Sequence, residues 1–231
     1  MKVAILLSGG VGSRMGLEMP KQYVQVEGYP VFYYCLKTLL NNENTDVLVV
    51  GVADEWNAYV KEILLKLNST KKVLFAQPGE TRQYSIFNAL KLLQAEQYQA
   101  DDIVLIHDAA RPLVSNSLIN RCYEGCKEAD GVIPMLSVKD TTYLSEDGKH
   151  IKALLNRSHL WSGQAPEAFR FGKYLQIHEE MSRENLLKIN GSTEIAFQAG
   201  LNCQMIEGDP MNFKITTPED LLNFERIISK S

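Results

Sequence analysis

Short apolar runs recur along the chain and alternate with segments whose apolar residues have helical spacing. The candidate strands are residues 3–7, 46–52, 72–76, 102–107, 131–136 and 204–208. Helical periodicity is found at residues 29–42, 56–68, 81–96 and 116–129. Nearly continuous apolar strands that alternate with helices are typical of a parallel sheet covered by helices. The sequence therefore predicts an α/β fold with a mostly parallel sheet.

The chain has 231 residues, a length that suits one large domain. No repeat or linker divides it, so we expect residues 1–231 to form a single domain. Residues 138–161 break the strand–helix alternation, because two polar strands flank Asp147-Gly148, a favoured two-residue hairpin turn. A lone two-stranded ribbon is marginally stable in water. We therefore expect residues 138–161 to form a protruding arm that is exchanged between the protomers of a homodimer.

The charge balance argues against nucleic acid as a partner. The formal net charge is −4 and the pI is near 5.7, whereas nucleic-acid binders normally have a basic balance. No apolar run approaches the roughly 18 residues of a membrane span, and the N-terminal run is too short for a signal peptide. Cys122 and Cys126 share a helix face, where buried small side chains are favoured over a metal pair. We expect a cytoplasmic protein without a membrane partner.

A glycine-rich turn follows the first predicted strand. Gly9, Gly10 and Gly12 let backbone N–H groups approach phosphate oxygens closely. Arg14 and Lys21 follow the glycines and neutralise phosphate charge. The turn therefore predicts a phosphate-binding loop.

The common dinucleotide and P-loop motifs do not fit this turn. The dinucleotide fingerprint requires a small residue where Met15 stands, and a P-loop requires GxxxxGK followed by Ser or Thr. A tight surface turn with solvated cations is the structural alternative. The position of Arg14, and of Pro20 directly before Lys21, disfavours that alternative.

Ligands of open α/β sheets bind at the carboxyl ends of the strands. This rule selects three loops, Ser8–Gly12, Gly79–Thr81 and His107–Arg111. A carboxylate at Asp108 can hold Mg²⁺ against a triphosphate, and the small Ala109 leaves room for a ribose. The alternative is that Asp108 only caps a turn.

Two predicted helix starts carry further candidates. Thr81 can cap the helix that follows it. Arg82 and Ser85 then lie in the first turn of that helix, where backbone N–H donors favour polar ligands. A structural cap with an exposed Arg82 is the alternative. Lys214 lies at a strand end just before a second helix start, for which Thr217 is the expected N-cap. By itself, Lys214 is most simply a solvated lysine.

Six motifs occur in order along almost the whole chain: GGVGSRMG…MPKQY, PGETRQYSI, HDAARP, VKDTT, NRSHLWSGQAPEAF and NFKITTPEDL. Together they resemble nucleotidyltransferases, and more narrowly the cytidylyltransferases of the methylerythritol 4-phosphate and ribitol 5-phosphate type. The resemblance implies a Rossmann-like sheet of the nucleotide-diphospho-sugar transferase type with a β-hairpin arm. It also implies an enzyme that uses CTP, a small polyol phosphate and Mg²⁺ or another divalent cation.

The resemblance further implies roles for individual residues. The catalytic cations are Arg14, Lys21 and Lys214. The nucleotide-binding residues are Ser8, Gly9, Gly10, Gly12, Gly79, Arg82, Ser85, Asp108 and Ala109. The acceptor-binding residues are Thr141 and Arg157, from an arm that reaches into the partner's site, and Thr193. The candidate metal ligands are Asp108 and Asp209.

Several positions depart from the family pattern. Glu194 stands where a shorter acid is typical, and Met211 where the methylerythritol branch usually has an acid. Ala165 and Glu167 replace the usual Thr and Gln, whereas Gly163 matches the ribitol branch. The acceptor therefore stays open between the two branches. Two other functions also stay open: an NAD(P)-binding oxidoreductase, which the glycine-rich turn disfavours, and a non-catalytic nucleotide-binding or scaffold protein derived from this family.

Overall fold

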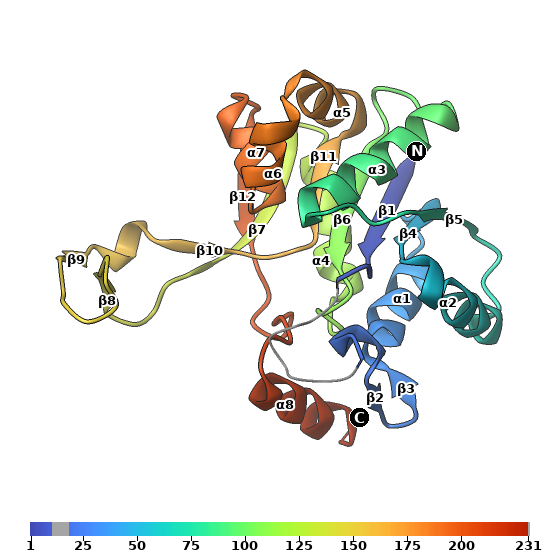
Figure 1. Cartoon of the computed structure of the whole chain (residues 1–231), viewed down its shortest axis with the longest axis horizontal. Helices are drawn as coiled ribbons and strands as arrows, with labels where there is room; N and C mark the ends of the chain where they lie inside the picture. Colours follow the sequence, from blue (N-terminus) through green and yellow to red (C-terminus); the bar gives the residue numbers. More distant parts are fainter. Residues whose placement is uncertain (11–18, 231) are drawn as a thin grey trace.

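The computed structural model describes residues 1–10 and 19–230. Its main sheet has eight strands: β1 (Lys2–Leu7), β4 (Val47–Gly51), β5 (Lys72–Ala76), β6 (Ile103–Asp108), β7 (Gly131–Ser137), β10 (Trp161–Gly163), β11 (Glu167–Arg170) and β12 (Cys203–Glu207). The strand order is β10-β7-β11-β6-β1-β4-β5, and β12 also pairs with β7 (Figure 1). All six predicted strands are present in this sheet.

Most neighbouring strands run parallel. β1 pairs in parallel with β4 and β6, β4 with β5, and β7 with β12. The exceptions are β11, which is antiparallel to β6 and β7, and β10, which is antiparallel to β7. The predicted mostly parallel α/β sheet is confirmed, whereas the two short reversed strands were not expected from the pattern of apolar runs.

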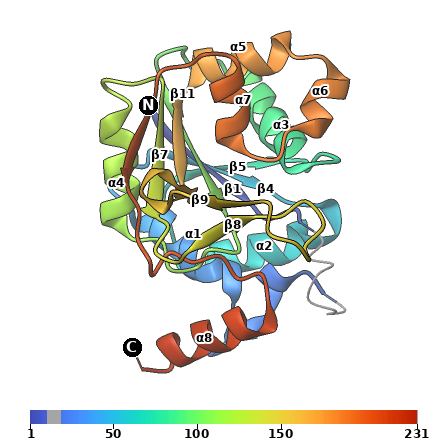
Figure 2. The same cartoon turned by 90° about the vertical axis from the view of Figure 1, so that its left-hand side faces the viewer.

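Helices cover both faces of the sheet (Figure 2). Their bounds are α1 (Val31–Asn41), α2 (Asp54–Leu67), α3 (Arg82–Ala95), α4 (Asn116–Gly125), α5 (Phe171–Glu180), α6 (Arg183–Lys188), α7 (Ser192–Gln198) and α8 (Pro218–Ile228). Successive residues of β1 alternate between two apolar clusters. Ala4 and Leu6 pack in the cluster that includes α1, α2 and α4, and Val3 and Ile5 in the one that includes α3, α5, α6 and α7.

The sheet register aligns the carboxyl ends of the central strands. Leu7 of β1 pairs with Gly51 of β4 and with Asp108 of β6. Just beyond these pairs, the Ser8 N–H donates to the Gly51 carbonyl at 2.8 Å, and the Ala109 N–H to the Leu7 carbonyl at 3.0 Å. The loops that follow β1 and β6 therefore start side by side.

Side-chain caps fix two helix starts that border this edge. The Thr81 hydroxyl accepts the Tyr84 N–H at 3.2 Å and begins α3. Thr217 and Asp220 form a capping box at the start of α8, and Pro218 follows the cap. Both predicted N-caps are confirmed. The α8 helix packs through Phe224 against Val26 and Val31, beside the short hairpin of β2 (Gln25–Val26) and β3 (Tyr29–Pro30).

The segment 138–161 extends away from the main sheet (Figure 1). It contains the antiparallel pair β8 (Thr142–Leu144) and β9 (Ala153–Leu155), followed by the 3₁₀ helix η3 (Arg157–His159). The predicted hairpin is present, but the predicted two-residue turn is wrong, because residues 145–152 connect the strands. The Asp147 carboxylate accepts the N–H groups of Lys149 and His150, which closes a wider loop.

Two expectations concern membrane spans and cysteines. None of the helices in the described residues is long and apolar enough to cross a membrane. All four cysteines are free, and Cys122 and Cys126 are buried. Within the described part of the chain, no group of three or more His, Cys, Asp or Glu side chains could hold a metal ion. Burial as small side chains therefore accounts for Cys122 and Cys126.

Candidate active site

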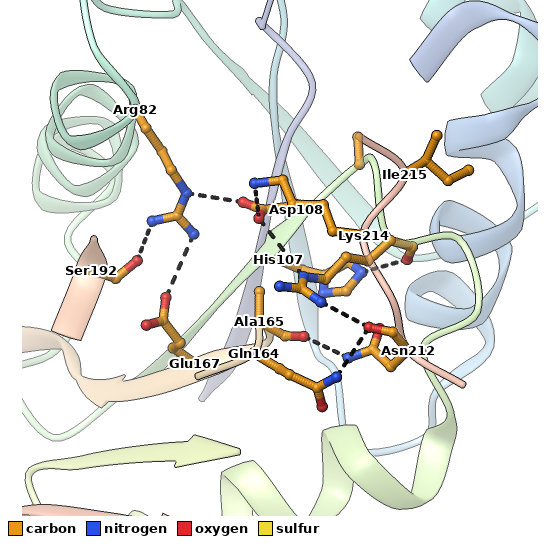
Figure 3. Close-up of polar contacts among 12 residues, drawn as sticks. Arg82, His107, Asp108, Gln164, Ala165, Glu167, Ser192, Asn212, Lys214 and Ile215 are labelled. Carbon is orange, nitrogen blue, oxygen red and sulfur yellow. Dashed lines mark hydrogen bonds and ion pairs between the residues drawn. The ribbon is translucent and has the colours of Figure 1, made fainter. Parts of the chain in front are cut away.

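The candidate site lies where the carboxyl ends of β1 and β6 meet the start of α3 and the segment before α8. It comprises Ser8–Gly10, Gly79–Ser85, Asp108–Arg111 and residues 212–215. Figure 3 shows part of this cluster, with Asp108 between Arg82 and Lys214. Gly12 and Arg14, two of the predicted site residues, lie outside the described residues.

Both described glycines of the first loop region have a clear spatial role. A Cβ atom added to Gly9 would lie 2.5 Å from the Cβ atom of Pro78, so the two loops approach too closely for any side chain there. A Cβ atom added to Gly10 would meet no described atom within 4 Å. Gly9 therefore permits close loop packing, and Gly10 lies beside open space.

Lys21 lies against the segment that carries Lys214, although the two predicted catalytic lysines come from opposite ends of the chain. Lys21 begins the 3₁₀ helix η2 (Lys21–Tyr23), and its Nζ atom donates to the Ile215 carbonyl at 2.6 Å. The Lys214 Nζ atom donates to Asp108 Oδ2 at 2.9 Å. The predicted strand end at Lys214 is wrong, because residues 213–216 form no strand. Lys214 is also not simply solvated, since it is paired with a buried carboxylate.

The segment that carries Lys214 is anchored on both sides. The Arg111 Nη1 atom donates to the Asn212 carbonyl at 2.8 Å, and the Asn212 side chain donates to the Ala165 carbonyl at 2.6 Å. The Ile215 N–H donates to the Ala110 carbonyl at 2.8 Å. These bonds hold Lys214 against the loop that follows β6.

Asp108 is the most strongly perturbed carboxylate of the site. Its side chain is 12% exposed, and it accepts Arg82 Nε at 2.9 Å and Lys214 Nζ at 2.9 Å. Arg111 Nε lies 3.9 Å from Oδ2. Burial raises the pKa of Asp108, but the surrounding cations outweigh burial and hold that pKa far below its ordinary value. The carboxylate therefore pairs with cations instead of capping a turn; the Asp108 carbonyl accepts the Arg111 N–H.

Arg82 connects three elements through one guanidinium group. Besides Asp108 of β6, it donates to the Ser192 hydroxyl at the start of α7, and it lies 3.5 Å from Oε2 of Glu167 in β11. The side chain is 26% exposed. Burial lowers the pKa of Arg82, but the Asp108 and Glu167 carboxylates outweigh burial and raise it. The alternative of an exposed Arg82 is therefore wrong, because its guanidinium is largely buried and paired with two carboxylates.

Neighbouring hydroxyl groups complete this network. The Thr193 hydroxyl donates to Glu167 Oε1 at 2.6 Å. Glu167 therefore links Thr193 to the Arg82 guanidinium. The Ser85 hydroxyl accepts the Gly79 N–H at 3.0 Å and donates to the Thr81 carbonyl, so it holds the loop before α3. The structure therefore brings Thr193, Arg82 and Asp108 into one connected cluster.

Two predicted residues lie on the arm, away from this cluster (Figure 1). Thr141 and Arg157 line one open hollow of ≈ 400 Å³, together with Leu154, Leu155 and Asn156. The Arg157 Nη1 atom donates to the Lys139 carbonyl at 2.6 Å. The predicted pair is thus brought together, but within one chain it is separate from Asp108.

Asp209 is the second predicted metal ligand. Its carboxylate accepts the Met211 N–H at 2.9 Å, and its own N–H donates to Gln164 at 2.9 Å. These bonds close the turn before Asn212. The Asp209 side chain is therefore engaged in local structure, whereas Asp108 faces the cations of the site.

Sequence reasoning did not assign Ser192 or Glu167 to the site, and it included Arg111 only as the last residue of the candidate loop His107–Arg111. Glu167 had attracted attention only as a departure from the family pattern, and Arg111 follows directly in the HDAARP motif. The contact of Glu167 with Arg82 depends on the pairing of β11 with β6, which the unexpected reversed strand creates.

A family of known proteins matches almost the whole chain. The family model "2-C-methyl-D-erythritol 4-phosphate cytidylyltransferase" (IspD) matches residues 2–230. The chain belongs to this family. The 2-C-methyl-D-erythritol 4-phosphate cytidylyltransferase of Clostridium beijerinckii is 35% identical over 228 residues, which cover 99% of this chain and 98% of that protein.

The ribitol branch of the family matches at a similar level. The ribitol-5-phosphate cytidylyltransferase of Vibrio parahaemolyticus is 33% identical over 230 residues, which cover 99% of this chain and 96% of that protein. The crystal structure of the Francisella tularensis IspD superimposes with a TM-score of 0.80 at 27% identity, over 97% of this chain and 99% of that one. The family supports a cytidylyltransferase and not the non-catalytic alternative, and the α/β fold matches the solved IspD structures.

Proposed function

We propose that this chain transfers the cytidylyl group of CTP to a small polyol phosphate, either ribitol 5-phosphate or 2-C-methyl-D-erythritol 4-phosphate, and releases pyrophosphate. Family membership supports the reaction class. The observation that carries the proposal is that Lys21 bonds the carbonyl of Ile215, next in the chain to Lys214, while Lys214 pairs with Asp108 at the carboxyl edge of the sheet. Two lysines there suit a reaction at a phosphate.

The chemistry is an in-line substitution. A phosphate oxygen of the acceptor attacks the α-phosphorus of CTP, a new P–O bond forms, and the bond from the α-phosphorus to the pyrophosphate oxygen breaks. A phosphate monoester is largely dianionic near neutral pH (second pKa about 6), so the attack requires no general base. Catalysis therefore depends on positioning and on stabilising negative charge.

The basic residues have distinct tasks in this proposal. The backbone amides that follow Ser8 in the Ser8–Gly12 loop and the Arg14 side chain bind the β- and γ-phosphates, since the Ser8 N–H itself is bonded to the Gly51 carbonyl. Lys21 and Lys214 stabilise the charge that develops around the α-phosphorus. For this, Lys214 exchanges its Asp108 partner for a phosphate oxygen.

Asp108 fits a magnesium site that is completed by the substrate. Mg²⁺ commonly binds one or two carboxylates together with substrate phosphates. Each oxygen of the Asp108 carboxylate keeps a lone pair beyond the one used by Arg82 or Lys214. We therefore propose Asp108 as the protein ligand and keep Asp209 as the second candidate. The bound cation would neutralise triphosphate charge.

The acceptor side of the site is proposed to need a second copy of the chain. Thr141 and Arg157 would hold the acceptor phosphate of the other protomer, since Arg suits bidentate phosphate contact. Thr193 keeps lone pairs that can accept a hydroxyl of the polyol. The arm also exposes Tyr143 and Leu154, whose burial in a homodimer would stabilise the exchanged arm.

A pyrophosphate-release assay with CTP and a panel of polyol phosphates tests the function. We expect release that depends on both CTP and one of the two named acceptors. Release with neither acceptor at any enzyme concentration would overturn the proposal. The acceptor that supports turnover also assigns the chain to isoprenoid precursor synthesis or to cell-wall or capsule synthesis.

A further inference from the structure

The three residues of the 3₁₀ helix η2 contact two separate parts of the site. Lys21 donates to the Ile215 carbonyl. Gln22 Nε2 donates to the Ser8 carbonyl at 2.8 Å and to the Gly10 carbonyl at 2.7 Å. The Tyr23 hydroxyl donates to the same Ser8 carbonyl at 3.0 Å. The short turn therefore joins the glycine loop to the segment of Lys214.

Gln22 acts entirely within the protein. It is 4% exposed, so its amide does not reach a ligand in the site. Both of its N–H groups are used on carbonyls of the glycine loop. Because one planar amide group bonds two carbonyls, it fixes the orientation of two peptide planes at once.

The direction of these carbonyls decides where the loop amides point. A trans peptide is planar, so its N–H points opposite to its C=O. The Ser8 carbonyl faces Gln22, and the Gly9 N–H therefore points away from Gln22. Pro78 packs closely against Gly9, while the space around Gly10 is open within the described residues. The loop is therefore held from the protein side and left accessible at Gly10.

We propose that Gln22 is a positioning residue for the reaction, which sets the phosphate-binding amides of the glycine loop and the place of Lys21 together. This inference rests on the proposed function. Tyr23 anchors the other end of the same turn, since it is 2% exposed and stacks on Trp56 with ring centroids 4.2 Å apart. The turn is therefore fixed at Tyr23, and the two hydrogen bonds of Gln22 hold the glycine loop in a set position relative to the turn.

The substitution Gln22→Met tests the proposal, because methionine has a similar length and no N–H donor. In a folded variant we expect the KM for CTP to rise about tenfold and kcat to fall about tenfold, whereas the acceptor KM stays within about twofold. The matched control is Gln25→Met. Gln25 is exposed and donates to the Tyr59 hydroxyl, so this control should leave all three constants unchanged.

Unchanged CTP constants in folded Gln22→Met would overturn the proposal. An equal rise in both KM values would also overturn it, because it would indicate general loosening of the site. Urea unfolding of both variants establishes that the proteins compared are folded at the assay temperature.

A second variant covers the case in which Gln22→Met folds poorly. In Gln22→Glu, the protonated carboxyl still donates one hydrogen bond, whereas the ionised form donates none and repels both carbonyls. We expect kcat/KM for CTP, relative to the native chain, to fall about tenfold between about pH 5 and pH 8. A ratio that stays constant over this range would overturn the proposal.

Failure of the proposed function has a different signature. If the native chain releases no pyrophosphate with any polyol phosphate, the function is wrong whatever Gln22 does. If the native chain is active and the folded Gln22 variants match it, only the positioning role is wrong.

Discussion

The Lys214 ammonium group lies 2.9 Å from the Asp108 carboxylate, although the two residues are 106 positions apart in the chain. Asp108 ends the central strand β6, and Lys214 lies on the segment just before α8. The pair keeps a buried carboxylate compensated. Arg82 pairs with the same carboxylate, so Asp108 would keep a cation partner in the movement of Lys214 proposed above.

Lys21→Ala should lower kcat at least about a hundredfold, since charge stabilisation by one well-placed group contributes about 3 kcal/mol to a transition state. The protein should stay folded, as judged by circular dichroism and urea unfolding. Lys66→Ala is the matched control, because Lys66 is exposed and forms an ion pair with the exposed Glu62 on the surface of α2. Near-native turnover by folded Lys21→Ala would exclude the proposed role.

Asp108→Asn should destabilise the protein by about 3 kcal/mol near neutral pH, because it leaves buried cations without their partner. The folded-state pKa of Asp108 lies below its ordinary value. Its stabilising effect is therefore complete above the unfolded pKa of about 3.9 and is lost as the pH falls toward the folded pKa.

Urea unfolding at several pH values measures this dependence. The difference in free energy of unfolding between the native chain and Asp108→Asn should shrink as the pH falls below about 4. A difference that stays constant down to about pH 2 would contradict the ion-pair account of Asp108.

Much of the fold was predictable because its signals are local. The apolar runs of the parallel strands alternate with helices, and the Thr81 and Thr217 caps act within one turn of chain. The two-residue turn was predicted wrongly, because the Asp147 carboxylate bonds N–H groups two and three residues ahead and stabilises a wider loop. The reversed strand β11 was missed because it has only four residues and no apolar run of its own.

The site was predictable only in part, for a related physical reason. Asp108 ends β6 and the glycine loop follows β1, so their convergence follows from the parallel pairing of these two strands. The contacts of Arg82 with Glu167 and Ser192 depend on where β11 and α7 lie in space, which no local pattern reports. The assignment of Arg82 to nucleotide binding came from the family resemblance, and it stays a prediction.

Arg82→Lys should lower kcat/KM about tenfold, because lysine keeps the charge but has no planar fork to reach three acceptors together. The loss should be accompanied by a lower urea midpoint, since Ser192 and Glu167 lose their contacts. Steady-state kinetics with the proposed substrates measures the effect. Arg183→Lys is the control, because Arg183 is exposed and paired with Glu80. Equal kinetics for Arg82→Lys and the native chain would contradict the connecting role of Arg82.

Arg157→Ala should raise the acceptor KM about tenfold or more, since a charge-assisted phosphate contact is lost. The KM for CTP should change little, because Arg157 lies on the arm. Lys152→Ala removes a cation from the same exposed arm and serves as the control. An unchanged acceptor KM in Arg157→Ala would show that the arm does not bind the acceptor. Sedimentation as a monomer at micromolar concentration would count against the exchanged dimer.

Phosphorus NMR of the complete reaction tests the central claim most directly. With CTP, Mg²⁺ and the active polyol phosphate, we predict that the CTP and monoester signals disappear together. A pyrophosphate diester and free pyrophosphate should appear in equal amounts. Conversion of CTP to CDP and orthophosphate, with the polyol phosphate unchanged, would contradict cytidylyl transfer.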